Sequence, residues 1–173
     1  MNHTTTLTPV AKLCFCLAIM LVPGWLTYTN SANKFTVNYP KEWTHRETGN
    51  SVLFLSPKEN ENDDFQENVN IMLQDLSANP LNLEQYTALS KKMITENAAA
   101  STILSSTPTT FAGQKAMETI YTMTFEGRAM KLQQIWFIKN KTAYVFTYTA
   151  EQSQYARYEP TATAIINSFK FLR

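Results

Sequence analysis

Three strand-like segments separated by two-residue turns constrain the fold of this chain more than any other feature. Residues 115–125, 129–138 and 142–150 alternate apolar and polar side chains, as half-buried strands do. Glu126-Gly127 and Asn140-Lys141 separate them. Connections this short join antiparallel neighbours, so the sequence predicts an antiparallel meander.

The segments before the meander predict three more strands. Residues 35–39 alternate apolar and polar side chains before Pro40, and residues 52–56 follow a turn near Gly49-Asn50. The stretch "DDFQENVNIMLQDL", residues 63–76, begins in an acidic loop and then alternates. Its second half predicts a strand with Val69, Ile71 and Leu73 on the core face. A further segment, residues 101–111, is interrupted by Pro108 and fits an edge strand or a bulge.

Two segments have the apolar period of a helix. The first predicts a helix from about Leu83 to Ala98, with Asn82 and Gln85 in a capping-box pattern. The second predicts a helix that starts near Pro160, because proline disrupts a helix interior. Strands, a helix, a meander and a final helix indicate an α+β domain, an antiparallel sheet that carries helices.

The N-terminal segment has the order of a secretory signal. Lys12 precedes the apolar run Leu13–Val22, and Pro23-Gly24 follows it. The sequence predicts a signal peptide over residues 1–32, cleaved after Ser31 or Ala32, and a single domain over residues 33–173. A retained membrane anchor is the alternative, although this run is shorter than the ~20 residues a spanning helix needs.

Export sets the expected location and the chemistry of the mature chain. The expected compartment is the periplasm, the thylakoid lumen or the extracellular space. Both cysteines, Cys14 and Cys16, lie within the apolar run and would be removed with it. A mature chain without cysteine needs no disulfide.

The mature chain has few catalytic side chains. His45 is its only histidine, which excludes a Cys-His pair and a His-rich zinc site. Its three glycines do not have the spacing of a phosphate-binding loop. We therefore expect no enzyme and no organic cofactor. A hydrolase that uses His45 or the acidic loop remains the alternative.

The acidic loop is the one candidate metal site. Asp63, Asp64 and Glu67, with Glu59 and Glu61 nearby, could supply oxygen ligands to calcium. The EF-hand spacing is absent, and Asp and Asn also favour turns on their own account. We expect a plain acidic turn that leads into a strand, with a calcium site as the alternative.

Charge is distributed unevenly along the chain. Residues 33–100 hold six bases and ten acids, and residues 101–173 hold eight bases and four acids. Such a dipole favours oriented docking on a charged partner. The candidate partner-binding residues surround one hairpin of the meander: Arg128, Lys131, Lys139 and Lys141. A nearly neutral exported domain is a poor nucleic-acid binder, so no nucleic acid is expected.

Several strings of this chain resemble PsbP-like proteins. They are "FTVNYPKEW", "DDFQENVNIMLQDL", "LEQYT" and the C-terminal "AYVFTYTAEQSQYARYEPTATAIINSFKF". The resemblance covers nearly all of the chain after the signal. It implies an α/β/α sandwich around a central antiparallel sheet and a non-enzymatic accessory role on the exported side of a membrane. In photosynthetic members it implies support of the manganese–calcium cluster of photosystem II and retention of calcium and chloride.

Two departures from the family pattern bear on its role. The signal leads almost directly into Phe35, without the extended N-terminal arm of plant-type members. The metal-binding histidines of some members have no counterpart here. The expected function is thus an exported, non-catalytic binding or assembly protein, in peripheral contact with a protein complex of a membrane. A small-ligand or lipid carrier, with an apolar pocket between sheet and helix, is the alternative.

Overall fold

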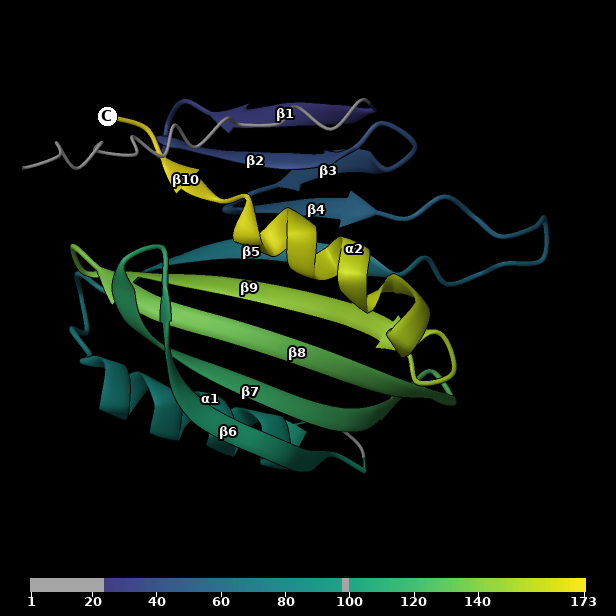
Figure 1. Cartoon of the computed structure of the whole chain (residues 1–173). Helices are drawn as coiled ribbons and strands as arrows, with labels where there is room; N and C mark the ends of the chain where they lie inside the picture. Colours follow the sequence, from purple (N-terminus) through teal and green to yellow (C-terminus); the bar gives the residue numbers. More distant parts are fainter. Residues whose placement is uncertain (1–23, 98–99) are drawn as a thin grey trace, which may run out of the picture.

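The computed structural model describes residues 24–97 and 100–173, which form two antiparallel sheets and two helices (Figure 1). The larger sheet has seven strands in the order β3-β4-β5-β9-β8-β7-β6. Its strands are β3 (Thr44–Thr48), β4 (Ser51–Leu55), β5 (Asn68–Asp75), β6 (Thr102–Phe111), β7 (Gln114–Phe125), β8 (Arg128–Lys139) and β9 (Thr142–Glu151). The smaller sheet has the order β1-β2-β10, from β1 (Trp25–Asn30), β2 (Phe35–Pro40) and β10 (Lys170–Phe171).

The predicted α+β class and the antiparallel meander are confirmed. Strands β7, β8 and β9 are consecutive neighbours in the sheet. The turn residues Glu126 and Gly127 have φ of 50° and 79°, and Asn140 and Lys141 have φ of 50° and 59°. Two successive left-handed residues match the twist of a two-residue hairpin. Pro108 lies in β6, which is an edge strand as expected.

The first helix, α1 (Leu83–Asn97), begins where the capping box predicts. The Asn82 side chain accepts the Gln85 N–H at 2.9 Å, and the Gln85 side chain accepts the Asn82 N–H at 3.0 Å. The two side chains therefore satisfy each other's backbone donors at the helix start. The predicted last residue, Ala98, lies outside the described residues.

The second helix, α2 (Tyr155–Asn167), begins five residues before Pro160, so the predicted start was wrong. Pro160 lies inside the helix, where it removes one backbone donor. The helix forms nonetheless because Ala162, Ile165 and Ile166 are buried on the sheet. Tertiary packing of this apolar stripe outweighs the local preference of one proline.

Strand β1 lies before residue 33, the predicted start of the domain, and is part of the smaller sheet. All six of its residues pair with β2, from Trp25 opposite Pro40 to Asn30 opposite Phe35. Its Tyr28 is buried, and the Tyr28 hydroxyl donates to Glu47 at 2.9 Å. A domain that began at residue 33 would lack this strand. Residues 1–23, with the apolar run, lie outside the described residues.

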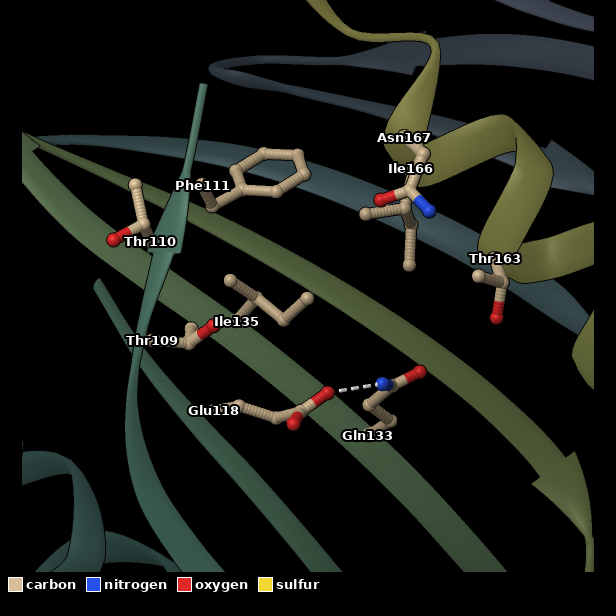
Figure 2. A pocket seen from close by; sticks show the side chains of 9 residues that line it. All are labelled: Thr109, Thr110, Phe111, Glu118, Gln133, Ile135, Thr163, Ile166 and Asn167. Carbon is tan, nitrogen blue, oxygen red and sulfur yellow. Dashed lines mark hydrogen bonds between the residues drawn. The ribbon is translucent and has the colours of Figure 1, made fainter. Parts of the chain in front are cut away.

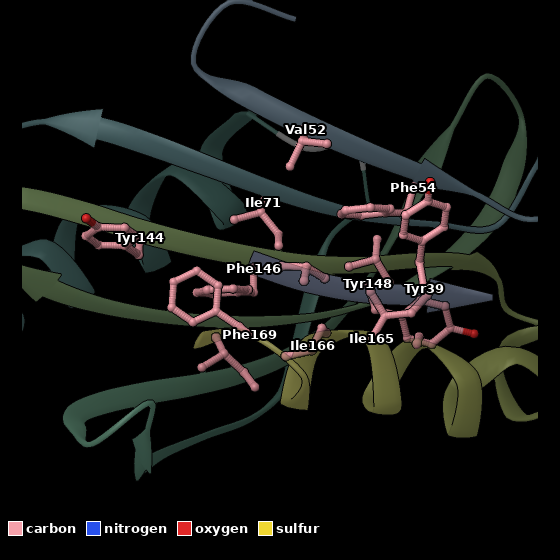
Figure 3. Packing of buried hydrophobic residues seen from close by; sticks show 14 of the residues in the cluster. Tyr39, Val52, Phe54, Ile71, Tyr144, Phe146, Tyr148, Ile165, Ile166 and Phe169 are labelled. Atoms are coloured by element: carbon pink, nitrogen blue, oxygen red, sulfur yellow. The ribbon is translucent and has the colours of Figure 1, made fainter. Parts of the chain in front are cut away.

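The two faces of the large sheet are covered differently (Figure 1). Helix α2 and the small sheet pack on one face, and α1 packs on the other near β6 and β7. The face under α2 holds an aromatic core, in which Phe146 of β9 lies 4.9 Å from Phe169, ring centre to ring centre. Figure 3 shows Phe146 beside Ile166 of α2, with Ile71 of β5 on its other side. Alternation along each strand delivers these side chains to one face.

None of the helices in the described ranges, 24–97 and 100–173, has the length and hydropathy to span a membrane.

Candidate functional site

The acidic loop between β4 and β5 lies at one end of the large sheet (Figure 1). Asp63 organises this loop: its carboxylate accepts the N–H of Glu59 at 2.9 Å and the N–H of Phe65 at 3.2 Å. These bonds close the loop on itself, as aspartate does in turns. Asp63 is therefore engaged as a turn former.

Arg128 contacts three of the remaining acids at this end. Its guanidinium forms an ion pair with Asp64, and it lies 3.6 Å from a Glu126 oxygen and 3.2 Å from a Glu151 oxygen. The guanidinium of Arg157 binds Glu59 in the same region. We call this region the acidic end; it comprises Glu59, Asp63, Asp64, Glu67, Glu126 and Glu151. Four of its six acids, all except Asp63 and Glu67, contact one of these two arginines.

Glu67 differs from the other acids of the loop because it is buried, with 2% of its surface exposed. Burial raises the pKa of the Glu67 carboxyl, and the nearby charges of Asp63 and Glu59 raise it further. Backbone N–H groups of Glu67 and Glu151 donate to the carboxylate and lower its pKa in part. No salt bridge to Glu67 occurs in the part of the chain that the structure describes.

The three candidate calcium ligands thus have three separate environments. Asp63 binds backbone groups, Asp64 binds Arg128, and Glu67 is buried beneath the loop. Across residues 24–97 and 100–173, no group of three or more ligating side chains is placed to hold a metal. The three residues line one open pocket together with Glu59 and Glu151, and calcium binding there stays the alternative to the predicted plain turn.

The four basic residues predicted to bind a partner do not form one patch. Arg128 begins β8 at the acidic end. Lys131 lies three residues further along the strand, with its Nζ 4.0 Å from the centre of the Tyr155 ring. Lys139 ends the same strand, and Lys141 follows in the β8–β9 turn. At ~3.3 Å per residue, the strand places Lys139 roughly 35 Å from Arg128 and roughly 26 Å from Lys131.

Lys139 and Lys141 belong to a second charged region at the opposite end of the sheet. The β6–β7 turn places Lys115 beside them, since Ala116 pairs with Phe137. The small sheet adds Lys34 and Lys170, because β10 pairs with the start of β2 and Lys139 Nζ lies 4.0 Å above the Phe171 ring. We call this region the lysine-rich end; it comprises Lys34, Lys115, Lys139, Lys141, Lys170 and Arg173.

The lysine-rich end lacks internal compensation. None of its six bases forms a salt bridge with a described residue. Asp75 ends β5 opposite Thr142 at this end, and its carboxylate accepts the Ser77 N–H at 2.8 Å. Sequence reasoning found only Lys139 and Lys141 of this group, because the other members come from distant segments.

His45 does not form part of a catalytic pair. It lies in β3, with its ring between those of Tyr28 and Tyr39, each 5.3 Å away between ring centres. Its Nδ1 lies 3.0 Å from the Tyr39 hydroxyl, its sole side-chain hydrogen-bond partner among described residues. A serine–histidine pair of the kind that a hydrolase uses is not assembled here.

An open groove of about 270 Å³ runs between α1 and the large sheet. Trp136, fully buried, forms its floor and donates a hydrogen bond from Nε1 to Thr87 at 2.9 Å. Met93 of α1, 54% exposed, forms its rim. The other lining residues are Met72, Gln74, Tyr86, Ser90, Ile94, Tyr121, Gln134 and Val145. This groove is the apolar pocket that a small-ligand carrier would need.

The antiparallel sheet and the two helices that cover its faces define an α+β domain. The model of the family described as PsbP-like protein matches residues 24–171. The chain belongs to the PsbP-like family. The match begins at residue 24 and so includes β1.

Solved structures share this fold at low sequence identity. A Pseudomonas aeruginosa protein of unknown function is 15% identical, with a TM-score of 0.62 over 83% of this chain and 94% of that one. Cyanobacterial PsbP (CyanoP) from Synechocystis is 11% identical, with a TM-score of 0.61 over 92% of this chain and 98% of that one. LpqN, involved in cell envelope biogenesis of Mycobacterium tuberculosis, is 10% identical, with a TM-score of 0.61 over 86% of this chain and 92% of that one. A comparison with curated proteins finds no match.

Proposed function

We propose that this protein is an exported, non-catalytic accessory protein that docks on a membrane protein complex through its lysine-rich end. One observation carries the proposal: four of the six acids of one end contact an arginine, whereas the six bases of the other end have no ion-pair partner in the described chain. A surface of unpaired like charges destabilises the free protein slightly and attracts an acidic surface.

The proposed contact is peripheral and oriented. The lysines lie at one end of the strands, so an acidic partner would bind the molecule end-on with the sheet pointing away from it. Exposed charges act over about 10 Å at ordinary ionic strength. Docking of this kind is therefore fast at low salt and weakens as salt is added.

Export is part of this proposal, and it requires a different processing point from the one expected. Cleavage after Ala32 would remove β1, which the fold uses, whereas cleavage after Gly24 would leave β1 complete. Gly24 is small and follows the apolar run directly, as a cleavage residue does. N-terminal sequencing of the exported protein should find Trp25 first. A first residue at Asn33 would contradict this proposal.

A role at photosystem II is the narrowest form of the proposal. It is supported by the family and by the name of its cyanobacterial structural neighbour. Acidic lumenal surfaces of a membrane complex would suit the lysine-rich end. Co-sedimentation with photosynthetic membranes would test this form separately from docking itself.

Charge reversal tests the docking proposal. Lys115 and Lys141 are exposed and make no side-chain hydrogen bond or ion pair among the described residues, so both can be changed to Glu without loss of packing. The matched control is Lys91→Glu with Lys92→Glu on α1, which changes the net charge equally. We expect the first variant to bind the membrane fraction at least about tenfold more weakly at low salt, and the control to bind as the native protein does. Equal loss in both variants would overturn the lysine-rich end as the docking surface.

The groove beside α1 favours a second candidate function, a carrier of a small apolar ligand. Its aromatic and methionine lining, open to solvent, is typical of a ligand site. Native mass spectrometry of the exported protein should then show a bound lipid. Ser90→Trp, which would fill the groove, should release it, and Ser153→Trp, outside the groove, should not.

A further inference from the structure

A hollow of about 200 Å³ lies between α2 and strands β6 to β8 (Figure 2). Its lining residue Thr110 pairs with Lys115, so one side of the hollow adjoins the lysine-rich end. It forms because α2 packs mainly on β5 and β9 and leaves the same face of β7 partly uncovered. Its volume is about that of six or seven water molecules in the liquid. A ligand for this hollow must therefore be smaller than a typical drug molecule.

One acid gives the hollow its charge. Glu118 of β7 is half-buried, and no lysine, arginine or histidine is among the residues that line the hollow. The nearest base on this face of β8 is Lys131, whose Nζ is placed over the Tyr155 ring. Glu118 has no salt bridge within the described chain. Its carboxylate is therefore available to pair with a cationic ligand.

Gln133 of β8 holds the Glu118 carboxylate in place. The Gln133 amide nitrogen donates to one Glu118 oxygen, and Figure 2 shows this bond between the two side chains on the sheet side of the hollow. The carboxylate can only accept, so the amide must present its nitrogen and not its oxygen. The second Glu118 oxygen has no partner in the parts of the chain that the structure describes.

The amide oxygen of Gln133 is buried without a hydrogen-bond partner, again among the described residues. A buried acceptor without a donor is unfavourable, so this pair is not explained by its contribution to stability. Such local costs are typical of side chains kept for a binding role.

The remaining walls divide into polar and apolar parts. Thr163 and Asn167 of α2 offer a hydroxyl and an amide at the mouth, and Phe111, Ile135 and Ile166 form the apolar wall. Figure 2 shows Ile135 and Ile166 facing each other from opposite sides. A complementary ligand carries a positive charge, several N–H donors and a short apolar chain.

We propose that this hollow binds a small aliphatic ammonium ion, whose charged head is held by Glu118 and whose carbon chain lies against Phe111, Ile135 and Ile166. The ligand would occupy a site distinct from the lysine-rich end, so the proposal stands apart from docking. Either one can fail without the other.

Titration with three probes of one size tests the proposal. Amide shifts of the ¹⁵N-labelled protein are followed with n-butylammonium, neutral 1-butanol and butyrate. We expect saturable shifts at Thr163 and Asn167 with n-butylammonium alone. Equal binding of 1-butanol, or no saturable shift in the folded native protein, would overturn the proposal.

Two variants and a control complete the test. Glu118→Gln removes the charge but can still pair with Gln133, and it should weaken n-butylammonium binding at least tenfold. Thr163→Met should fill the hollow and abolish binding. Glu42→Gln removes an exposed acid from the β2–β3 turn and should leave binding unchanged. Unchanged affinity in Glu118→Gln would show that the charge has no part in recognition and would contradict the proposal.

Discussion

At the acidic end of the sheet the charged side chains bind one another, whereas at the lysine-rich end they do not. Arg128 alone contacts three carboxylates, from Asp64, Glu126 and Glu151. The bases of the lysine-rich end have no such partners within residues 24–97 and 100–173. From this difference we expect the acidic end to contribute to the stability of the fold. We expect the lysine-rich end to bind the proposed partner. Substitutions at one end should therefore change stability, and substitutions at the other should change binding.

The largest effect is expected from removal of β1, the edge strand of the smaller sheet. A chain that begins at residue 33 lacks β1, so β2 loses its partner along all six residues and the buried Tyr28 is lost. We expect its free energy of unfolding to fall by about 3–5 kcal/mol relative to a chain that begins at residue 24. Urea unfolding of the two chains measures this. Equal stability would mean that β1 is not part of the folded domain.

The second prediction compares one substitution at the acidic end with one at the lysine-rich end. Arg128→Met leaves three carboxylates without their shared cation, and partly exposed pairs contribute less than 1 kcal/mol each. We expect the free energy of unfolding to fall by about 1–2 kcal/mol. Lys141→Gln at the other end should change it by less than about 0.5 kcal/mol. If both variants unfolded at the same urea concentration, the distinction between the ends would fail.

The third effect depends on pH and concerns Glu67. Burial raises the pKa of this carboxyl in the folded state above its unfolded value. The folded state then binds more protons in the window between the two values, so this group's contribution to stability falls as pH rises through that window. Glu67→Gln should remove that part of the pH dependence and should be more stable than the native protein at neutral pH. Urea midpoints at pH 4 and pH 7 measure both; a variant less stable at both would contradict the prediction.

The smallest effect is expected from calcium at the acidic end. The three candidate ligands are separately engaged, so millimolar calcium should shift the melting temperature no more than magnesium at equal ionic strength. Asp63→Asn with Asp64→Asn should leave that comparison unchanged. A calcium-specific rise of several degrees, lost in the double variant, would establish a site in the loop.

The strands and turns of the meander could be predicted because their signals are local. Alternation of apolar and polar side chains predicted the bounds of β7, β8 and β9 to within one or two residues. The two-residue turns between them predicted that they are antiparallel neighbours. The capping box likewise located the start of α1. Each of these features is set by side chains within a few residues of one another.

The errors arose where packing outweighs local signals. Strand β1 follows the apolar run within a few residues, so the sequence does not distinguish this strand from the end of a signal peptide. Strand β3 is fully exposed and has no apolar alternation, so only its pairing with β4 reveals it. Pro160 suggested a helix start, but the buried stripe of α2 extends past it.

The sequence by itself determined the fold class and the family, because periodicity and characteristic strings are properties of short segments. Only the tertiary structure decided which charges meet. It brought Lys34, Lys115 and Lys170 to the side of Lys139, and it moved Arg128 to the acids, roughly a strand length away. It also placed Glu118 beside Gln133 across two strands of the sheet. Charge–charge and hydrogen-bond energies depend on distances in space, and neighbours from distant segments leave no local pattern to read.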